Sequence, residues 1–245
     1  MAQEAVDLFE LLRANPYPGR GIAMGFSPDG DQAVWAYFIM GRSGNSRNRV
    51  FVLEGQELRI IPHDRDAIRD AGLIFYHPTA THKNRLILTN GDQTDTILAA
   101  LKLRQGFVSA LRTRAFEPDA PHYTPRISGM MDLHKGGTIR LSVLRAADSQ
   151  GTGCDRLFFE YPGLPGEGRF VHTYQGDGTP LPAFEGEPRR IRIPQDARAF
   201  AQAIWDSLNP ENRVALCVRA TALADGHTQF FIHQRHSIPE VPSNA

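Results

Sequence analysis

The feature that most constrains the fold is a long series of short, strand-like segments separated by turn signals. Each segment is rich in apolar, β-branched or aromatic residues, and clusters such as Ser27-Pro28-Asp29-Gly30 separate one from the next. Such a series predicts a protein built mainly from antiparallel strands. The predicted strands are residues 21–26, 33–40, 50–53, 58–61, 73–76, 85–89, 126–131, 138–146, 156–161, 169–174, 189–193, 214–223 and 229–233.

Long stretches of helical periodicity occur in two places, one in each half of the chain. Residues 94–115 repeat apolar side chains at helical spacing, with residues 92–94 as a candidate N-cap. Residues 196–208 form the second predicted helix, which begins near Asp196 and ends before Asn209-Pro210. A shorter helix over residues 4–13 is stopped by the turn residues that follow it.

Many strands with only two long helices predict an α+β fold rather than a doubly wound α/β fold. Two mainly antiparallel sheets stacked face to face, each covered by a helix layer, use these elements in a four-layer αββα sandwich. Neither half of the chain alone has enough helix to cover its sheet, so residues 18–236 are expected to form a single domain. Residues 1–17 are then a helical extension, and residues 237–245 a flexible tail.

Composition excludes several classes of function. Lys plus Arg and Asp plus Glu each number 27, so the formal net charge is zero, which argues against nucleic acid or an anionic membrane as the main partner. The acidic, amphipathic N-terminus does not resemble a signal peptide, and no apolar run has the roughly 18 residues of a membrane span. We therefore expect a cytoplasmic protein.

Motifs for metals and common cofactors are also missing from the sequence. Cys154 and Cys217 lie far apart, and the nine His residues are scattered, so neither a zinc site nor a disulfide framework is expected. There is no Walker loop, dinucleotide-binding glycine motif, nucleophile elbow or zinc-protease motif. The expected chemistry uses no cofactor and no metal, although a local cluster of basic residues could still bind a small anion.

The densest polar segment is residues 41–49, Gly-Arg-Ser-Gly-Asn-Ser-Arg-Asn-Arg, between two apolar strands. Its three arginines, two serines and two asparagines offer many hydrogen-bond donors, which suits a phosphate or another oxyanion. The alternative is a solvated turn at the edge of a sheet. The two apolar strands would hold the loop rigidly, which gives the binding role more weight but leaves both interpretations open.

A second polar segment, residues 89–96, joins a predicted strand to the first long helix. Asn90-Gly91 permits a tight turn, and the amides at a helix N-terminus commonly bind anions. The alternative is that Asp92, Thr94 and Asp95 only cap the helix. Spacing alone does not separate the two interpretations.

Single residues elsewhere are candidates for proton transfer or anion binding. Tyr76 ends a predicted strand, and Glu117 and Asp119 follow the first long helix. A tyrosine and a carboxylate beside an arginine loop would suit proton transfer at a carbonyl, although isolated residues of these types are more often structural. Arg126 begins a strand, where it is either a surface charge or an anion ligand.

Four motifs, in order, resemble the archaeal-type IMP cyclohydrolases. They are Ala36-Tyr37-Phe38-Ile39-Met40-Gly41-Arg42-Ser43 with Arg47-Asn48-Arg49, the segment 89–97, Tyr123-Thr124-Pro125-Arg126-Ile127, and Pro18-Gly19-Arg20 at the start. The resemblance covers roughly residues 18–233, with the matched motifs in the first half. It implies an Ntn-hydrolase-like αββα sandwich without a self-processed nucleophile, and a purine ribonucleotide as the small-molecule partner.

The resemblance also implies which residues form the site. The catalytic residues would be Arg49, Tyr76 and Glu117, and the substrate-binding residues would be Arg42, Ser43, Arg47, Asn48, Asn90, Gly91 and Arg126. The loop here is a residue longer than is common in the family, so both Arg47 and Arg49 are candidates for the functional loop arginine. The extension before Asn15 is a candidate for contacts in a homo-oligomer or for covering a sheet.

The implied activity is closure of 5-formamidoimidazole-4-carboxamide ribotide to inosine monophosphate with loss of water, the last step of de novo purine synthesis. The alternative is a non-catalytic purine-nucleotide sensor on the same scaffold. An Ntn-type amide hydrolase is not expected, because it needs a Ser, Thr or Cys as its first residue, and the sequence begins Met1-Ala2.

Overall fold

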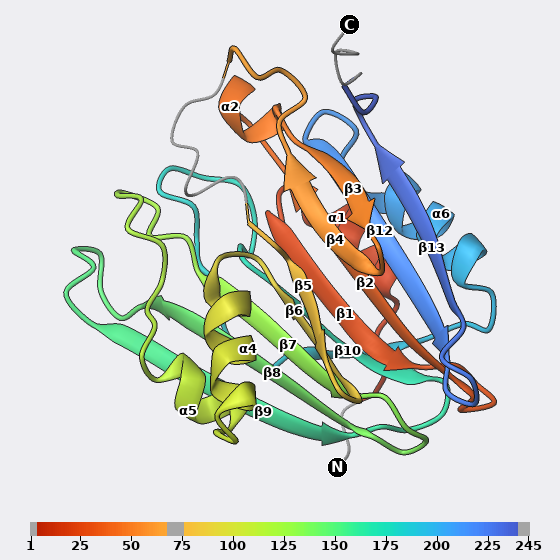
Figure 1. Ribbon diagram of the computed structural model, residues 1–245. Helices are drawn as coiled ribbons and strands as arrows, with labels where there is room; N and C mark the ends of the chain where they lie inside the picture. The colour runs from red at the N-terminus through yellow and green to blue at the C-terminus, as the bar shows by residue number, and fades with distance from the viewer. Residues whose placement is uncertain (1–3, 68–75, 240–245) are drawn as a thin grey trace, which may run out of the picture.

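A computed structural model describes residues 4–67 and 76–239 of the chain. These residues form an α+β structure with antiparallel sheets and few helices, which confirms the predicted class (Figure 1). Two large sheets and one separate hairpin contain the described strands. The outcome follows from the sequence pattern, since short apolar segments joined by tight turns pair most easily with their neighbours in the chain.

The larger sheet has six strands in the spatial order β11-β10-β1-β2-β12-β13, with antiparallel pairing throughout. Strands β1 and β2 form its centre, joined by a turn in which Gly30 adopts a positive φ of 72°. The strands are β1 (Arg20–Phe26), β2 (Gln32–Met40), β10 (Glu167–His172), β11 (Arg189–Arg192), β12 (Arg213–Ala222) and β13 (Thr228–Gln234).

The second sheet has five strands in the order β5-β6-β7-β8-β9, again antiparallel. The separate hairpin β3-β4 contacts β12 on one side and β5 on the other, so it bridges the two sheets. The strands are β3 (Val50–Glu54), β4 (Glu57–Ile61), β5 (Thr79–His82), β6 (Arg85–Thr89), β7 (Arg126–Asp132), β8 (Thr138–Ala146) and β9 (Cys154–Pro162).

The two large sheets pack against each other through alternate side chains of their central strands. Ile22 and Met24 of β1 share one buried cluster with Ile127 of β7 and with Leu141 and Val143 of β8. Intervening residues point the other way, because successive side chains of a strand face opposite sides of the sheet. Both faces of each central strand are therefore buried, which explains their nearly continuous apolar sequence.

Helices cover the outer faces of both sheets (Figure 1). Helices α1 (Leu8–Ala14) and α6 (Ala197–Ser207) bury Leu12, Phe200 and Ile204 against the outward side chains of the six-stranded sheet. Helices α4 (Gln93–Lys102) and α5 (Phe107–Leu111) pack similarly on the five-stranded sheet. Helix α1 lies against α6, with the edge of one of the Phe9 and Phe200 rings against the face of the other.

The structure corrects several predicted boundaries. The helix predicted over residues 94–115 is two helices, α4 and α5, because Arg104 turns to a positive φ of 60° and Gly106 is extended. Helix α1 begins at Leu8 rather than residue 4, since Val6 instead donates its N–H to the Arg190 carbonyl beside β11. The second long helix agrees with its prediction, and Asp196 caps it.

Two loops also differ from their predictions. The segment 41–49 contains a one-turn helix, α2 (Gly44–Arg47), which Ser43 and Ser46 close with a reciprocal capping box. The strand predicted over residues 73–76 lies outside the described residues except for Tyr76, which belongs to no strand. On the side away from β7, β6 pairs with β5, a polar strand that the apolar pattern did not reveal.

Candidate functional site

A buried group of polar side chains lies at the end of the stacked sheets where β1 begins and β2 ends. We call it the arginine–tyrosine cluster, and electrostatic interactions link its members to one another. The chain brings them together from six separate segments: Arg20, Tyr37, Arg49, Tyr76, Glu117 and Tyr174. Two of them, Tyr37 and Tyr76, also border the apolar core between the sheets.

Arg49 is only 1% exposed and is held by backbone carbonyls. Its Nε donates to the Ser46 carbonyl at 2.8 Å, and its Nη2 donates to the Met40 carbonyl at 3.3 Å. The remaining terminal nitrogen, Nη1, is buried without a hydrogen-bond partner among the described residues. Burial, together with the charge of Arg20, lowers the pKa of Arg49. A buried cationic donor in this state favours an anionic or carbonyl oxygen.

Arg20, which is half-buried, opens β1 and contributes a second buried donor, its Nε, to the cluster. Its backbone N–H is held by the Thr173 hydroxyl at 3.1 Å, but its Nε is buried without a described partner. Burial disfavours the charge of Arg20, yet the Glu117 carboxylate and the tyrosine oxygens outweigh it and raise the pKa of the guanidinium. The cluster thus holds two guanidinium groups against one carboxylate.

Tyr37 and Tyr76 form a close hydroxyl pair, with their oxygens 2.6 Å apart. The Tyr37 ring stacks on Phe51, which fixes its direction. Burial raises the pKa of both tyrosines, and the nearby arginines oppose that shift without cancelling it. Both hydroxyls therefore keep their protons at neutral pH. Because one proton joins the pair, the other remains available for a ligand.

Glu117 is the carboxylate of the cluster and is 3% exposed. Its backbone N–H is bound to the Thr124 carbonyl at 2.9 Å, whereas its carboxylate forms no ion pair or hydrogen bond with a described residue. Burial raises the pKa of Glu117, although Arg20, Arg126 and Arg49 oppose the rise. A carboxylate with a raised pKa and no fixed partner suits a general base.

Tyr174 closes the cluster on the side of β10. Its hydroxyl lies 2.5 Å from the Thr124 hydroxyl, which in turn donates to the Asp119 carboxylate at 2.5 Å. The Tyr174 ring stacks on Tyr17, with 5.9 Å between centroids. The guanidinium of Arg42 lies 5.1 Å above the Tyr17 ring, so Arg42 stands at the rim of the cluster.

The other residues predicted in the 41–49 segment make local contacts. Arg42 pairs with Asp177 at 2.5 Å, and Ser43 caps α2. Arg47 donates to the Gly41 carbonyl at 2.9 Å. Asn48 exchanges two hydrogen bonds with the backbone of Asp64. Of the two candidate loop arginines, the structure places Arg49, not Arg47, in the buried cluster.

Asn90, Gly91 and Arg126 belong to a neighbouring network, in which Gln93 links the Asn90 and Arg126 side chains by hydrogen bonds. Asn90 is fully buried and ties the Pro125 carbonyl to the Ile127 N–H. A Cβ on Gly91 would lie 2.4 Å from Nη1 of Arg126, so only glycine leaves room for that guanidinium. Arg126 itself donates to Asp92 at 2.5 Å.

Asp92 occupies the N-cap position of α4, but its side chain makes no capping hydrogen bond, so the capping interpretation does not hold for this residue. Its carboxylate instead binds Arg114 and Arg126. Burial alone would raise the pKa of Asp92, but these two arginines outweigh it and lower the value. The Asp92 carboxylate therefore holds two arginines in place and does not bind the N–H groups at the start of the helix.

Sequence reasoning missed three members of the cluster as site residues: Arg20, Tyr37 and Tyr174. Arg20 and Tyr37 lie inside motifs that carry the family resemblance, which was the available signal. Tyr37 is flanked by apolar residues of β2 and looks like an ordinary core tyrosine. No sequence signal singled out Tyr174, because its neighbours in the cluster are distant in the chain.

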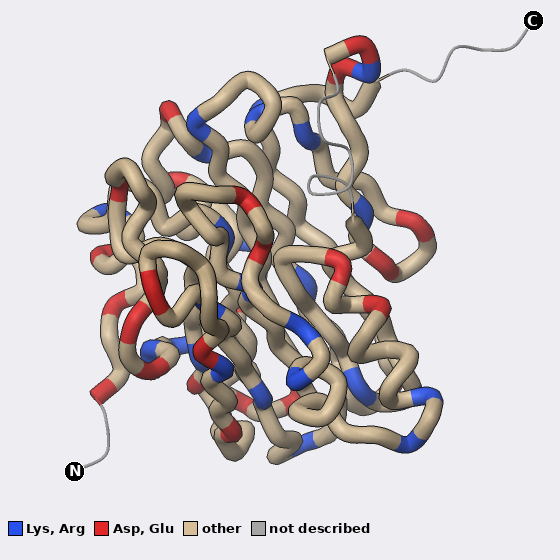
Figure 2. Tube along the Cα trace, turned by 90° about the vertical axis from the view of Figure 1, so that its left-hand side faces the viewer, with Lys and Arg blue, Asp and Glu red and all other residues tan. Residues whose placement is uncertain are grey.

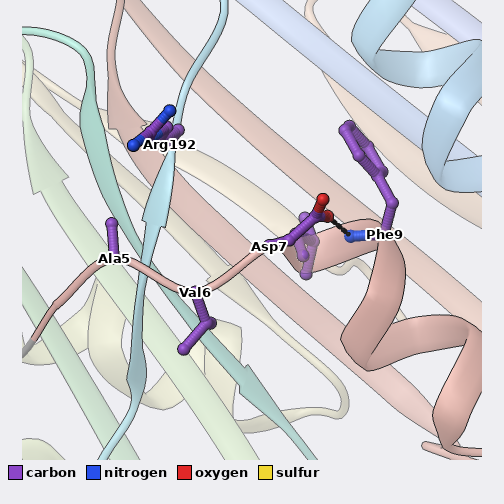
Figure 3. Close-up of a pocket in the computed structure, with 6 residues that line it drawn as sticks. Ala5, Val6, Asp7, Phe9 and Arg192 are labelled. Carbon is purple, nitrogen blue, oxygen red and sulfur yellow. Dashed lines mark hydrogen bonds between the residues drawn. The ribbon is translucent and has the colours of Figure 1, made fainter.

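Away from the cluster, a cavity of about 310 Å³ lies between the N-terminal segment and β11 (Figure 3). Asp7 and Arg192 are its charged residues, and the Asp7 carboxylate already accepts the Phe9 N–H at 2.7 Å. Over the molecule as a whole, basic and acidic positions are interspersed in the view of Figure 2. The buried, unpartnered donors of the arginine–tyrosine cluster distinguish it from this cavity.

Within the described ranges, no three His, Cys, Asp or Glu side chains are grouped as a metal ion would need. The described helices are also all too short or too polar to cross a membrane. Cys154 and Cys217 are both free thiols.

Comparison with known proteins gives one clear finding. Comparison with curated proteins returns no match. Comparison with protein families matches residues 17–226 to the family described as IMP cyclohydrolase-like protein. The matched range contains all six members of the arginine–tyrosine cluster. The chain therefore belongs to the IMP cyclohydrolase-like family.

Proposed function

We propose that the protein is an IMP cyclohydrolase, which closes 5-formamidoimidazole-4-carboxamide ribotide to inosine monophosphate and water. The observation that carries the proposal is the arginine–tyrosine cluster. It combines unpartnered guanidinium donors, protonated tyrosines and a carboxylate of raised pKa in one buried place. Family membership supports the same activity.

Ring closure joins the carboxamide nitrogen to the formyl carbon on the same imidazole. The carboxamide nitrogen loses one proton and the formyl oxygen gains one, which gives a carbinolamine. The C–O bond then breaks and the hydroxyl leaves as water with a second proton, while the formamido nitrogen loses its proton as the C=N bond forms. The atoms balance without an oxidant, a reductant or a second substrate.

The residues of the cluster match these needs. Arg49 and Arg20 would stabilise negative charge on the formyl oxygen, as an oxyanion hole does. Tyr76, supported by Tyr37, would protonate that oxygen and later the departing hydroxyl. Glu117 would take protons from nitrogen. Holding both substrate groups in contact can contribute roughly 7–11 kcal/mol to the lowering of the barrier.

Binding of the 5′-phosphate is assigned to Arg42, Ser43 and Arg126 at the rim. Arg42 and Arg126 are paired with Asp177 and Asp92, so a phosphate would compete with these carboxylates for the same donors. Asn90 and Gly91 would act on the base or ribose through the Arg126 network. Arg47 and Asn48 would hold the loop that carries Arg49.

The layer order also fits this assignment. Helices outside two stacked antiparallel sheets form the αββα arrangement expected of an Ntn-hydrolase-like enzyme. We place the reaction in the cytoplasm, where the sequence leads us to expect the protein.

The test is to add the purified protein to the formamido ribotide and follow formation of inosine monophosphate by absorbance. Turnover that depends on Glu117 and Arg49 supports the proposal. If the protein binds inosine monophosphate but leaves the ribotide unconverted, it is a sensor rather than an enzyme. If it neither binds nor converts, the purine assignment is wrong.

A further inference from the structure

Three residues form a hydrogen-bonded chain from the cluster outward: Tyr174, Thr124 and Asp119. Tyr174 and Thr124 are each 2% exposed, whereas Asp119 is half-buried. The Asp119 carboxylate accepts the Thr124 N–H at 2.7 Å and the Thr124 hydroxyl at 2.5 Å, one bond to each oxygen. Both carboxylate oxygens are thus fixed by the same residue, which holds the threonine hydroxyl in one orientation.

The direction of the hydrogen bonds follows from chemistry. A carboxylate only accepts, so the proton of the Thr124 hydroxyl points at Asp119. The threonine oxygen can then only accept the bond from the Tyr174 hydroxyl, 2.5 Å away. The proton of Tyr174 is therefore used inside this chain. Towards the cluster, the Tyr174 hydroxyl oxygen can therefore act only as a hydrogen-bond acceptor.

The Tyr37–Tyr76 pair has the opposite polarity. Only one of its two protons lies between the oxygens, so the pair retains a proton to donate. Arg20 and Arg49 add further donors, since Nε of Arg20 and Nη1 of Arg49 are buried and unpartnered. The cluster therefore has a donor-rich part and, at Tyr174, a position whose hydroxyl only accepts.

We propose that Tyr174, oriented by Thr124 and Asp119, is a specificity-determining residue that accepts a hydrogen bond from an amide N–H of the ligand. This inference rests on the proposed function. In the formamido substrate the donor is the carboxamide nitrogen, and in inosine monophosphate it is the ring nitrogen N1 that derives from it. A purine with a lone pair at N1, as in adenosine monophosphate, would place one hydrogen-bond acceptor against another, the Tyr174 oxygen, with no proton between them.

The test compares the affinities of inosine and adenosine monophosphates for the full chain by calorimetry. The wild type is expected to prefer inosine monophosphate. The Tyr174→Phe variant keeps the ring and its stack on Tyr17, and we expect its preference to fall by about tenfold, the effect of one buried hydrogen bond. A Tyr161→Phe variant, which removes a hydroxyl bonded to Glu187 outside the cluster, is the matched control and should keep the preference.

Thr124 supplies a second pair of variants. Thr124→Val breaks the chain at nearly constant volume and should reduce the preference as Tyr174→Phe does, whereas Thr124→Ser keeps the hydroxyl and should restore it. If both ligands weaken equally in Tyr174→Phe and Thr124→Val, Tyr174 only packs and the inference is wrong. A wild type without preference also overturns it. Turnover of the formamido ribotide, measured separately on the wild type, shows whether the proposed function itself has failed.

Discussion

The protein uses its arginines differently in two neighbouring regions. In the Asp92 network, Arg114 and Arg126 both donate to one carboxylate, and Gly91 leaves room for the Arg126 guanidinium. In the arginine–tyrosine cluster, Arg20 and Arg49 each keep a buried nitrogen without a described partner. Satisfied polar groups stabilise structure, whereas buried unsatisfied groups cost stability and call for an explanation such as a catalytic role or a bound water or ion.

The contrast indicates where chemistry and where support are located. The cluster is expected to govern turnover, and the Asp92 network to govern geometry and binding. Substitutions in the two regions should therefore affect different measured quantities.

The largest effect is expected from Glu117→Gln. The substitution keeps the shape of the side chain and removes the base, so kcat should fall by about a hundredfold or more, within the usual contribution of general acid–base catalysis. Steady-state kinetics on the formamido ribotide measure it. Asp95→Asn, at an exposed position of α4, is the control and should retain wild-type kcat. A Gln variant with normal turnover would remove Glu117 from the mechanism.

The pH dependence of the same variant sharpens the test. Burial raises the pKa of Glu117, so wild-type kcat/KM should decline as the pH falls through that raised value, and the Gln variant should lack this limb. Above the raised pKa, the folded protein carries a carboxylate charge that burial disfavours. Glu117→Gln should therefore unfold at a higher temperature than the wild type there, and the difference should shrink as the pH falls.

Arg49→Ala is expected to lower kcat by at least about tenfold, guided by the loss of one oxyanion donor. Arg47→Ala should change kcat less, because its guanidinium binds the Gly41 carbonyl outside the cluster. Arg140 lies on β8 and pairs with Asp132 and Glu160 of the two neighbouring strands, so Arg140→Ala controls for a general loss of positive charge. Equal losses in Arg47→Ala and Arg49→Ala would mean that the loop acts as a whole.

Gly91→Ala should act on binding rather than on chemistry. The added Cβ would lie 2.4 Å from the Arg126 guanidinium and displace it, so KM should rise several-fold while kcat changes little. Gly106→Ala is the matched control, since a Cβ there meets nothing within 4 Å. A fall in kcat as large as that of Arg49→Ala would show that the Asp92 network belongs to the catalytic machinery.

The sequence predicted the strands better than the helix boundaries, for a physical reason. A strand between turn residues is defined locally, and β1, β2 and β8 appear close to where the pattern places them. The apolar helical spacing continues across Arg104 and Gly106, so periodicity alone suggested one helix where the backbone makes two. Strand β5 has polar residues and is defined by its pairing with β6, which no local pattern contains.

The candidate site divides in the same way. Arg49, Tyr76 and Glu117 were singled out because family motifs or unusual local composition marked them. Tyr174 and Tyr37 gain their significance only when the two sheets stack and bring distant segments together. Asp92 shows the converse, since its position before a helix suggested a cap, and only the fold reveals two arginines within reach.

The smallest effect compares two aspartates at helix N-caps. Asp196 accepts the Arg198 and Ala199 N–H groups at 2.9 Å, whereas Asp92 accepts none from its helix. Asp196→Ala should therefore lower the free energy of unfolding by about 1 kcal/mol, as lost caps do, and leave kcat and KM unchanged. Urea unfolding at neutral pH measures the first quantity. Asp92→Ala should instead raise KM, because Arg126 loses the carboxylate that holds it beside Gly91. If Asp196→Ala and Asp92→Ala changed the free energy of unfolding and KM alike, the two aspartates would not differ in function, although only one of them caps its helix.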